Sequence, residues 1–497
     1  MSTQKKIFKN VFASMLPQIV NIISSFILPV LIIKLYGSEI NGLVSTIKNI
    51  ISYISLVGAG ISTAVIQSLY APVANHESEI VKGMLKATAD MFNKCGWIYL
   101  GIVALVSVLY PFIVKESISY FTILLLVIVM SISGASEFFV VGRCRALLYA
   151  DQKVYVCTII QALSLITSLI MAIIMLKLNA HIVLVQFTIS FVYVVRAFLL
   201  SHYVKKNYPQ YSFSKNTPSI KSAVAKRKNA MIHQLSGLFV FGSQSIILSI
   251  FVSLEAASIY AIYNIIFSGL SAICGNINTA ITPFLGKTYA TAQITKVRSE
   301  FNIVELSCFV LTVVIFSVTL KTILPFVKIY TNGSDIDYVY PLFAISFTIG
   351  QLFNIFRLPH SAMINVAGHF KETQNRALME SFICISFSLL FTYMYGMYGV
   401  LIGTGLAFMW RCLDMIIYVH KHILFDSIRL SLKRLLSVLG IISIVYFITS
   451  TPCDISNYYE WCMFAFKELI ITLIVLFIFI SLFERKSVKY LYNILRK

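Results

Sequence analysis

Long apolar segments follow one another along nearly the whole chain, and they constrain its fold more than any other feature. Only 12% of the 497 residues are charged, and the mean hydropathy is +0.84. Polar surface is therefore too scarce to coat a soluble protein of this length. A window of about 20 residues, the helix length that spans a bilayer, predicts fourteen transmembrane helices in an all-α integral membrane protein: 7–33, 40–70, 91–114, 118–142, 154–176, 180–203, 230–252, 256–285, 300–327, 338–366, 376–395, 397–420, 435–451 and 464–483.

Basic residues test this count independently, because the hydropathy scan had excluded them. With the N-terminus placed in the cytoplasm, 30 of the 40 Lys and Arg residues fall on the cytoplasmic side and four on the outside. The positive-inside rule therefore favours fourteen spans with both termini cytoplasmic. The net charge of +20 then indicates contact with anionic membrane lipids, and it is weak evidence for nucleic acid.

Two parts of the sequence resemble each other at an offset of 216 positions. Residues 39–66 and 255–282 are identical at seven of 28 aligned positions, where chance identity of roughly 8% would give about two. This offset carries predicted helices 1 and 2 onto helices 7 and 8. We therefore predict two six-helix lobes related by an axis along the membrane normal, followed by two further helices: an N-lobe (1–203), a basic cytoplasmic linker (204–229), a C-lobe (230–422) and a segment with helices 13 and 14 and a basic tail (423–497).

Polar residues line one face of predicted helix 2, and we call this set the polar seam. Its members are spaced by 4, 3, 4, 3 and 7 positions, which keeps them on one side of a helix: Asn41, Ser45, Lys48, Ser52, Ser55 and Ser62. Related residues occur on predicted helices 1, 7 and 8: Gln18, Asn21, Gln234, Asn264, Ser268 and Asn278. Small polar residues often only pack membrane helices together. Asn, Gln and Lys on the same faces favour a hydrated central cavity instead.

Basic residues inside the predicted helices are candidates for binding an anion, since each costs roughly 2.5 to 3.5 kcal/mol at the bilayer centre unless paired or hydrated. Lys48 lies about 12 Å from the outer end of its helix and has no acidic residue one turn away. Arg357 is a second candidate, although it could also reach the cytoplasmic face. Arg411 is a third, and Asp414 three positions later permits a local ion pair.

Acidic residues inside the predicted helices are candidates for ion coupling. Asp414 and Glu137 are the two that we single out for this role. Glu137 and Glu380 lie within two turns of the predicted cytoplasmic boundary, where we expect a solvated carboxylate.

Sequence patterns typical of catalysis or of metal and cofactor binding are absent. The chain has no P-loop and no HExxH, its longest predicted outside loop has about a dozen residues, and its nine cysteines form no CxxC pair. Cys453 and Cys462 share one predicted outside loop, where a disulfide remains an open alternative. We therefore expect no catalytic residues, no metal and no cofactor, but a carrier with a basic interior suited to an anionic cargo.

Five short stretches of the sequence resemble a known family. They are 35–43 (LYGSEINGL), 68–74 (SLYAPVA), 149–156 (YADQKVYV), 375–381 (NRALMES) and 399–404 (GVLIGT). Together with the fourteen-helix pattern they resemble the bacterial polysaccharide-biosynthesis proteins known as Wzx-type oligosaccharide flippases. This family belongs to the MOP (multidrug/oligosaccharidyl-lipid/polysaccharide) exporter superfamily, so the resemblance implies a MATE-like fold.

The resemblance also implies a cargo, an undecaprenyl-pyrophosphate-linked oligosaccharide that alternating access moves to the outer leaflet. Lys48, Arg357 and Arg411 would then attract the pyrophosphate, and the amides named above would bind sugar hydroxyls. A polysaccharide polymerase and a chain-length regulator are the implied protein partners. Gly58 stands where relatives often have an acidic residue, so a coupling role there is missing or displaced.

Three alternatives to this function remain open. A lipid II flippase fits the same composition. A MATE-type multidrug or ion antiporter shares the repeat but usually binds organic cations, which the basic seam disfavours. A membrane polysaccharide polymerase is an enzyme, and the short outside loops disfavour it.

Overall fold

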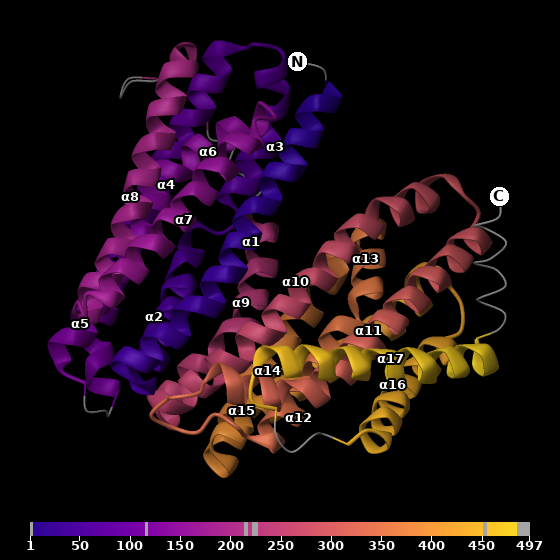
Figure 1. Cartoon of the computed structure of the whole chain (residues 1–497). Coiled ribbons are helices and arrows are strands. Elements are labelled where there is room, and N and C mark those ends of the chain that lie inside the picture. Colours follow the sequence, from indigo (N-terminus) through magenta and orange to yellow (C-terminus); the bar gives the residue numbers. More distant parts are fainter. Residues whose placement is uncertain (1–2, 115–117, 213–216, 221–226, 451–454, 485–497) are drawn as a thin grey trace. The chain divides into compact units, whose positions relative to one another are not determined.

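The computed structural model describes residues 3–114, 118–212, 217–220, 227–450 and 455–484, with the side chains of 3–12, 63–64, 227–236 and 279–280 left out of the description. The described residues form helices and connecting loops without any β-strand (Figure 1). Thirteen of these helices are long and apolar enough to cross a membrane. The remaining predicted span, 230–252, coincides with α9 (Arg227–Phe251), whose apolar described part is Gly237–Phe251. The all-helical membrane fold expected from the sequence is thereby confirmed.

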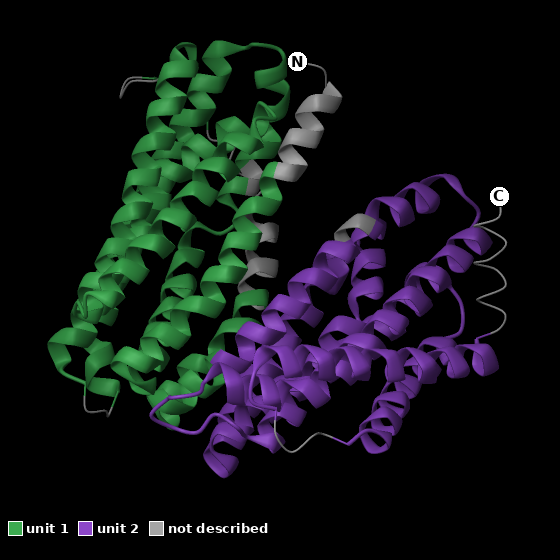
Figure 2. Ribbon diagram, in the orientation of Figure 1, with its two compact units in different colours: residues 1–261 green, residues 262–497 purple. Residues whose placement is uncertain are grey.

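The chain forms two compact units, residues 1–261 and 262–497 (Figure 2). Unit 1 contains α1 (Thr3–Tyr36), α2 (Ser38–Ile54), η1 (Ser55–Gly58), α3 (Ile61–Ala74), α4 (Ser78–Ile113), α5 (Tyr120–Ser136), η2 (Glu137–Val141), α6 (Gly142–Ala150), α7 (Val154–Lys177), α8 (Ile182–Asn207), η3 (Pro209–Tyr211), α9 and the start of α10 (Leu254–Thr291). Unit 2 contains the rest of α10, α11 (Ile294–Tyr330), α12 (Pro341–Phe356), α13 (Leu358–Ala367), α14 (Phe370–Tyr395), α15 (Met397–Val419), η5 (His420–Leu424), α16 (Arg429–Ile448) and α17 (Tyr458–Phe483).

The boundary between the units falls inside α10 because α9 packs along α2. The hydroxyl of Thr46 donates to the carbonyl of Ser245 at 3.3 Å, and that of Tyr53 donates to the carbonyl of Leu238 at 2.9 Å. Predicted helix 7 thus packs with the N-terminal helices. The lobe boundaries at 203 and 230 rest on the sequence repeat and stay a prediction.

Both units expose large apolar side chains on their outer surfaces. Phe112 and Phe121 of unit 1 and Phe477 of unit 2 are 71–72% exposed. Exposed apolar surface on this scale marks contact with lipid or with another protein in place of water. It agrees with the expectation that both units are embedded in a bilayer.

Predicted helix 2 (40–70) is broken, which the sequence analysis did not anticipate. Gly60 has φ +76°, so the chain turns there between η1 and α3. Glycine adopts this left-handed conformation without the steric cost that a side chain would bring. Gly58 beside it has no room for a side chain, since a Cβ there would lie 2.4 Å from the ring of Phe138. The matching region of the repeat, 274–276, continues as a regular helix in α10.

Helices α14 and α15 pack closely because glycine lets their backbones approach. A Cβ on Gly399 would lie 2.1 Å from the carbonyl carbon of Phe391, and one on Gly403 would lie 2.2 Å from the backbone nitrogen of Ser388. Small residues at such crossings are typical of membrane helix pairs. This pair forms the wall of unit 2 that carries Glu380, Arg411 and Asp414.

Candidate functional site

The polar seam runs from a buried end to an accessible middle. Asn41 is buried, and its amide donates to the hydroxyl of Ser258 in α10 at 2.7 Å. The hydroxyls of Ser52 and Ser55 donate to carbonyls of their own helix, at 3.0 and 2.8 Å, so their oxygens still offer lone pairs. Lys48 is exposed on the surface of unit 1. The seam therefore presents a cationic group and hydrogen-bond acceptors on one accessible face of α2.

Lys48 carries an uncompensated charge. No acidic oxygen in the described part of the chain lies within 4.0 Å of its ammonium group. An unpaired cation inside a membrane span is unfavourable unless water or an anionic ligand reaches it. Lys48 lies one turn before Ser52 and two turns before Ser55, which both line the cavity described next.

A cavity of about 270 Å³ lies where α2 breaks into η1 and α3. It is lined by Ser52, Ser55, Leu56, Gly58, Ala59, Gly60, Ser62, Phe92, Gly134, Glu137, Phe138, Arg145 and Leu238. Three seam serines thus face the same cavity as a carboxylate and a guanidinium group.

Glu137 holds two arginines at this cavity. Its carboxylate lies 2.6 Å from Nη1 of Arg145 and 3.1 Å from Nη2 of Arg196, and Arg145 also donates to the hydroxyl of Ser62 at 3.2 Å. The expectation of a solvated carboxylate at Glu137 is met only in part, because its side chain is 30% exposed but two guanidinium groups compensate its charge. Glu137 begins the π-helical segment η2, a local irregularity that is frequent at functional sites. One acid and two bases leave the group with a net charge of +1.

In unit 2 the other two predicted cations are paired. Arg357 lies 2.5 Å from Oε1 of Glu380 and donates to the side chain of Asn354 at 2.8 Å. Arg411 lies 3.4 Å from Oε2 of Glu380 and 2.8 Å from Asp414, so the local ion pair that the spacing permitted is present. Asp414 also pairs with Arg376.

This chain of ion pairs, which we call the arginine network, corrects a second expectation. Glu380 is only 7% exposed and bridges two arginines, so it is not a solvated carboxylate at the membrane boundary. Three arginines and two acids leave the arginine network with a net charge of +1. Arg357 and Arg411 are thus less available to an incoming anion than Lys48 is.

The remaining candidates are distributed over both units. Gln18 and Asn21 are exposed on α1 in unit 1. Ser268 is exposed in unit 2, where its hydroxyl donates to the carbonyl of Ile265 at 3.0 Å. Asn264 and Asn278 of α10 are half-buried, and the side-chain oxygen of Asn278 has no hydrogen-bond partner among the described residues. The side chain of Gln234 and residue Cys453 lie outside the described residues.

Sequence reasoning missed Arg145 and Arg376 as parts of these groups. Both were counted as cytoplasmic loop residues, whereas they lie in α6 and α14. Arg145 follows Glu137 by eight positions, or about two helical turns. This spacing could have predicted that the two side chains lie on the same face.

Comparison with solved structures identifies the fold. A MATE family multidrug transporter of the MOP superfamily, in an inward-facing conformation, matches with a TM-score of 0.63 and 12% identity over 86% of this chain and 99% of that chain. The lipid II flippase MurJ, in an inward closed conformation, matches with a TM-score of 0.68 and 15% identity over 95% of this chain and 98% of that chain. A mutant of the Vibrio cholerae MATE transporter VcmN matches with a TM-score of 0.59 and 14% identity, over 85% and 98%.

The chain has the MATE and MurJ transporter fold. At 12–15% identity the likeness concerns the fold alone. No protein-family model matches the sequence, and no curated protein matches it. The expected MATE-like fold is confirmed.

Proposed function

We propose that this protein is a flippase that moves an undecaprenyl-pyrophosphate-linked oligosaccharide across the bacterial cytoplasmic membrane by alternating access. The observation that carries the proposal is Lys48, an accessible cation without an acidic partner in the described residues. A pyrophosphate supplies the charge that this position lacks, and it is a better partner for an ammonium group than the organic cations that a multidrug exporter binds.

The surroundings of Lys48 support an anionic and polar cargo. The cavity at the far end of the polar seam is lined by Glu137 and Arg145, and with Arg196 this group has a net charge of +1. Ser52, Ser55 and Ser62 line the same cavity and suit the hydroxyls of a sugar. A cationic drug would meet repulsion at both places.

We infer separate roles for the two basic groups of the protein. Lys48 binds the phosphate end of the cargo directly, because no carboxylate competes for it. Arg357 and Arg411 act through Glu380, and their pairing must loosen before either can bind a phosphate. Gln18, Asn21, Gln234, Asn264, Ser268 and Asn278 are the proposed contacts to sugar hydroxyls.

A lipid II flippase is the second candidate, and the extent of the structural likeness favours it over a multidrug exporter. MurJ covers 95% of the chain and the MATE transporter 86%, a difference of about 45 of the 497 residues. Helix α16 has 20 residues and helix α17 has 26. A chain that is longer than a MATE transporter by about two helices fits the flippase branch of this fold.

Complementation tests the proposal in cells. Lys48→Ala and Lys48→Glu are expressed in a strain that lacks its own copy of the gene and makes no surface polysaccharide. Both variants should fail to restore polymer at normal membrane abundance, while Lys34→Ala, an exposed lysine at the end of α1, should restore it. Normal polymer from Lys48→Ala would remove Lys48 from the proposed site.

A further inference from the structure

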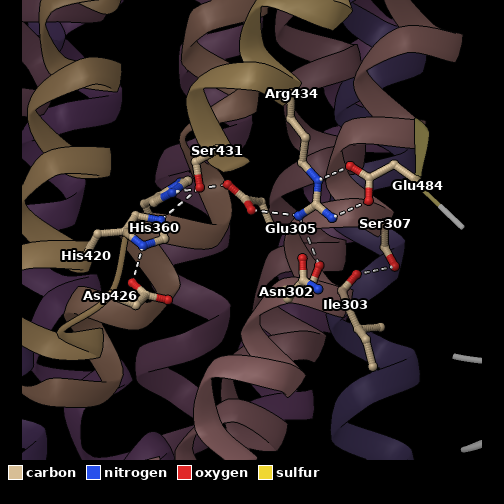
Figure 3. Close-up of polar contacts among 10 residues, drawn as sticks. All are labelled: Asn302, Ile303, Glu305, Ser307, His360, His420, Asp426, Ser431, Arg434 and Glu484. Atoms are coloured by element: carbon tan, nitrogen blue, oxygen red, sulfur yellow. Dashed lines mark hydrogen bonds and ion pairs between the residues drawn. The ribbon is translucent and has the colours of Figure 1, made fainter. Parts of the chain in front are cut away.

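A buried group of two histidines and one glutamate lies in unit 2 and shares no residue with the arginine network. Glu305 of α11, His360 of α13 and His420 of η5 each offer one ligand atom, and these atoms lie within 4.8 Å of one another. The exposed fractions of the three residues are 2%, 0% and 4%. Figure 3 shows the three side chains pointing toward one another from three separate elements. Imidazole nitrogens with one carboxylate oxygen form a ligand set typical of divalent transition metals.

His360 is buried without any of the partners that a buried imidazole normally has. Neither of its nitrogens has a hydrogen-bond partner among the described residues, and its Nε2 lies 3.5 Å from Oε1 of Glu305, which also lacks one. Buried polar atoms are nearly always satisfied, so each exception needs an explanation. Nε2 of His360 and Oε1 of Glu305 thus face each other across the point where an ion would bind.

His420 and Glu305 are each oriented by a second polar contact. Nδ1 of His420 lies 2.5 Å from Oδ1 of Asp426, which leaves the lone pair on Nε2 to accept from Ser431 at 2.8 Å. Oε2 of Glu305 accepts from Nη1 of Arg434 at 2.7 Å, which leaves Oε1 free of that contact. Metal-ligating histidines commonly donate their second nitrogen to a carboxylate in this way.

Two further carboxylates and one guanidinium surround this group. Arg434 pairs with both Glu305 and Glu484 (Figure 3), and Asp426 pairs with His420. With both imidazoles neutral, the three candidate ligands themselves contribute one negative charge, which suits a cation.

We propose that Glu305, His360 and His420 form a binding site for a divalent transition metal such as Zn²⁺. Oε1 of Glu305, one ring nitrogen of His360 and Nε2 of His420 are the ligands. The Ser431 hydroxyl then turns its hydrogen away from Nε2, and its oxygen or a water completes a tetrahedron. Metal–ligand distances near 2.0 Å require the ligand atoms to approach to about 3.3 Å, a contraction that side-chain rotation supplies. The ion ties α11, α13 and η5 together, and this role is independent of the cargo proposed above.

Metal binding to the purified full-length protein tests this site. After treatment with a chelator and dialysis against Zn²⁺, the wild type should retain one zinc per chain, measured by elemental analysis. His360→Phe should lower the affinity at least about tenfold, and Asp426→Asn should lower it by about 10 to 100-fold, as expected for the loss of a ligand's supporting carboxylate. His422→Ala is the matched control, because His422 is an exposed histidine of the same segment η5, and it should bind zinc as the wild type does.

Co²⁺ gives a second readout that does not depend on any variant folding. Bound to nitrogen and oxygen ligands in a tetrahedral site, it should give strong visible absorption without the charge-transfer band that cysteine ligands produce. A wild type that binds less than stoichiometric zinc, or that leaves Co²⁺ with the spectrum of the hydrated ion, would overturn the proposal. Zinc binding by His360→Phe equal to that of the wild type would overturn it as well.

Discussion

Nη1 of Arg357 lies 2.5 Å from Oε1 of Glu380, and the second oxygen of the same carboxylate lies 3.4 Å from Nε of Arg411. Two cations that the sequence offered as separate anion sites are therefore joined through one acid on α14. Breaking a buried pair by removing one partner leaves an uncompensated charge, which is costly. We therefore infer that the main role of the arginine network is to stabilise unit 2.

Replacing Glu380 should therefore destabilise the protein. Glu380→Gln leaves Arg357 without an acidic partner in the arginine network and leaves Arg411 with Asp414 alone. We expect a loss of about 3 to 5 kcal/mol in unfolding free energy. Thermal unfolding in detergent measures it. Glu372→Gln, which changes an exposed acid of the same helix, should stay within about 0.5 kcal/mol of the wild type. Equal melting temperatures for the two variants would show that the arginine network contributes no stability.

The break between η1 and α3 makes a prediction at Gly60. Its φ of +76° costs an L-residue roughly 1 to 2 kcal/mol, so Gly60→Ala should lower the unfolding free energy by about this amount. Gly101→Ala is the control, because Gly101 is helical in α4 with nothing within 4 Å of an added Cβ, and alanine there should stabilise by about 0.5 to 1 kcal/mol. A Gly60→Ala protein as stable as the wild type would mean that α2 and α3 do not meet at this turn.

The crossing of α14 and α15 makes a prediction at Gly403. Gly403→Ala would place a Cβ 2.2 Å from the backbone nitrogen of Ser388, so the helices must separate. We expect poor yield and a lower melting temperature, measured by fluorescence-detected size exclusion during heating. Gly405→Ala on the same helix has its nearest neighbour at 3.8 Å and should be tolerated. Similar losses for both variants would argue against this helix packing.

The orientation of the protein is tested by labelling. Ser212 is exposed after η3 in the stretch predicted to be the cytoplasmic linker. A cysteine introduced there should react with a membrane-impermeant maleimide only in inverted vesicles or after permeabilisation. Reaction in intact cells would reverse the predicted topology.

The helices themselves follow from the sequence, because an apolar run of about 20 residues has one favourable structure in a bilayer. The same reasoning predicted 40–70 as one helix, although Gly58 and Gly60 stand in it. Glycine tolerates both helix and turn, so the choice depends on neighbours such as Phe138, which lies 80 positions away in the sequence.

The candidate site was predictable in part and for a similar reason. Lys48 and its serines share one helix, so their common face follows from spacing alone. Glu380 and Arg357 lie on different helices, and no spacing rule brings them together. The metal ligands Glu305, His360 and His420 lie 55 and 60 positions apart, far outside any metal-binding motif, and only the packing of α11, α13 and η5 reveals them.

The most direct test of the proposed function is transport by the purified protein in liposomes. Fluorescently labelled undecaprenyl-pyrophosphate oligosaccharide is placed in both leaflets, and the fraction that an external quencher reaches is followed over time, with labelled lipid II in a parallel sample. We predict that the wild type and Lys34→Ala move the oligosaccharide faster than empty liposomes do, and that Lys48→Ala slows this movement at least about tenfold, as expected for about 1.4 kcal/mol of lost binding. Movement of lipid II alone would select the lipid II flippase. No movement of either lipid by a folded wild type, or equal rates with and without Lys48, would contradict the account.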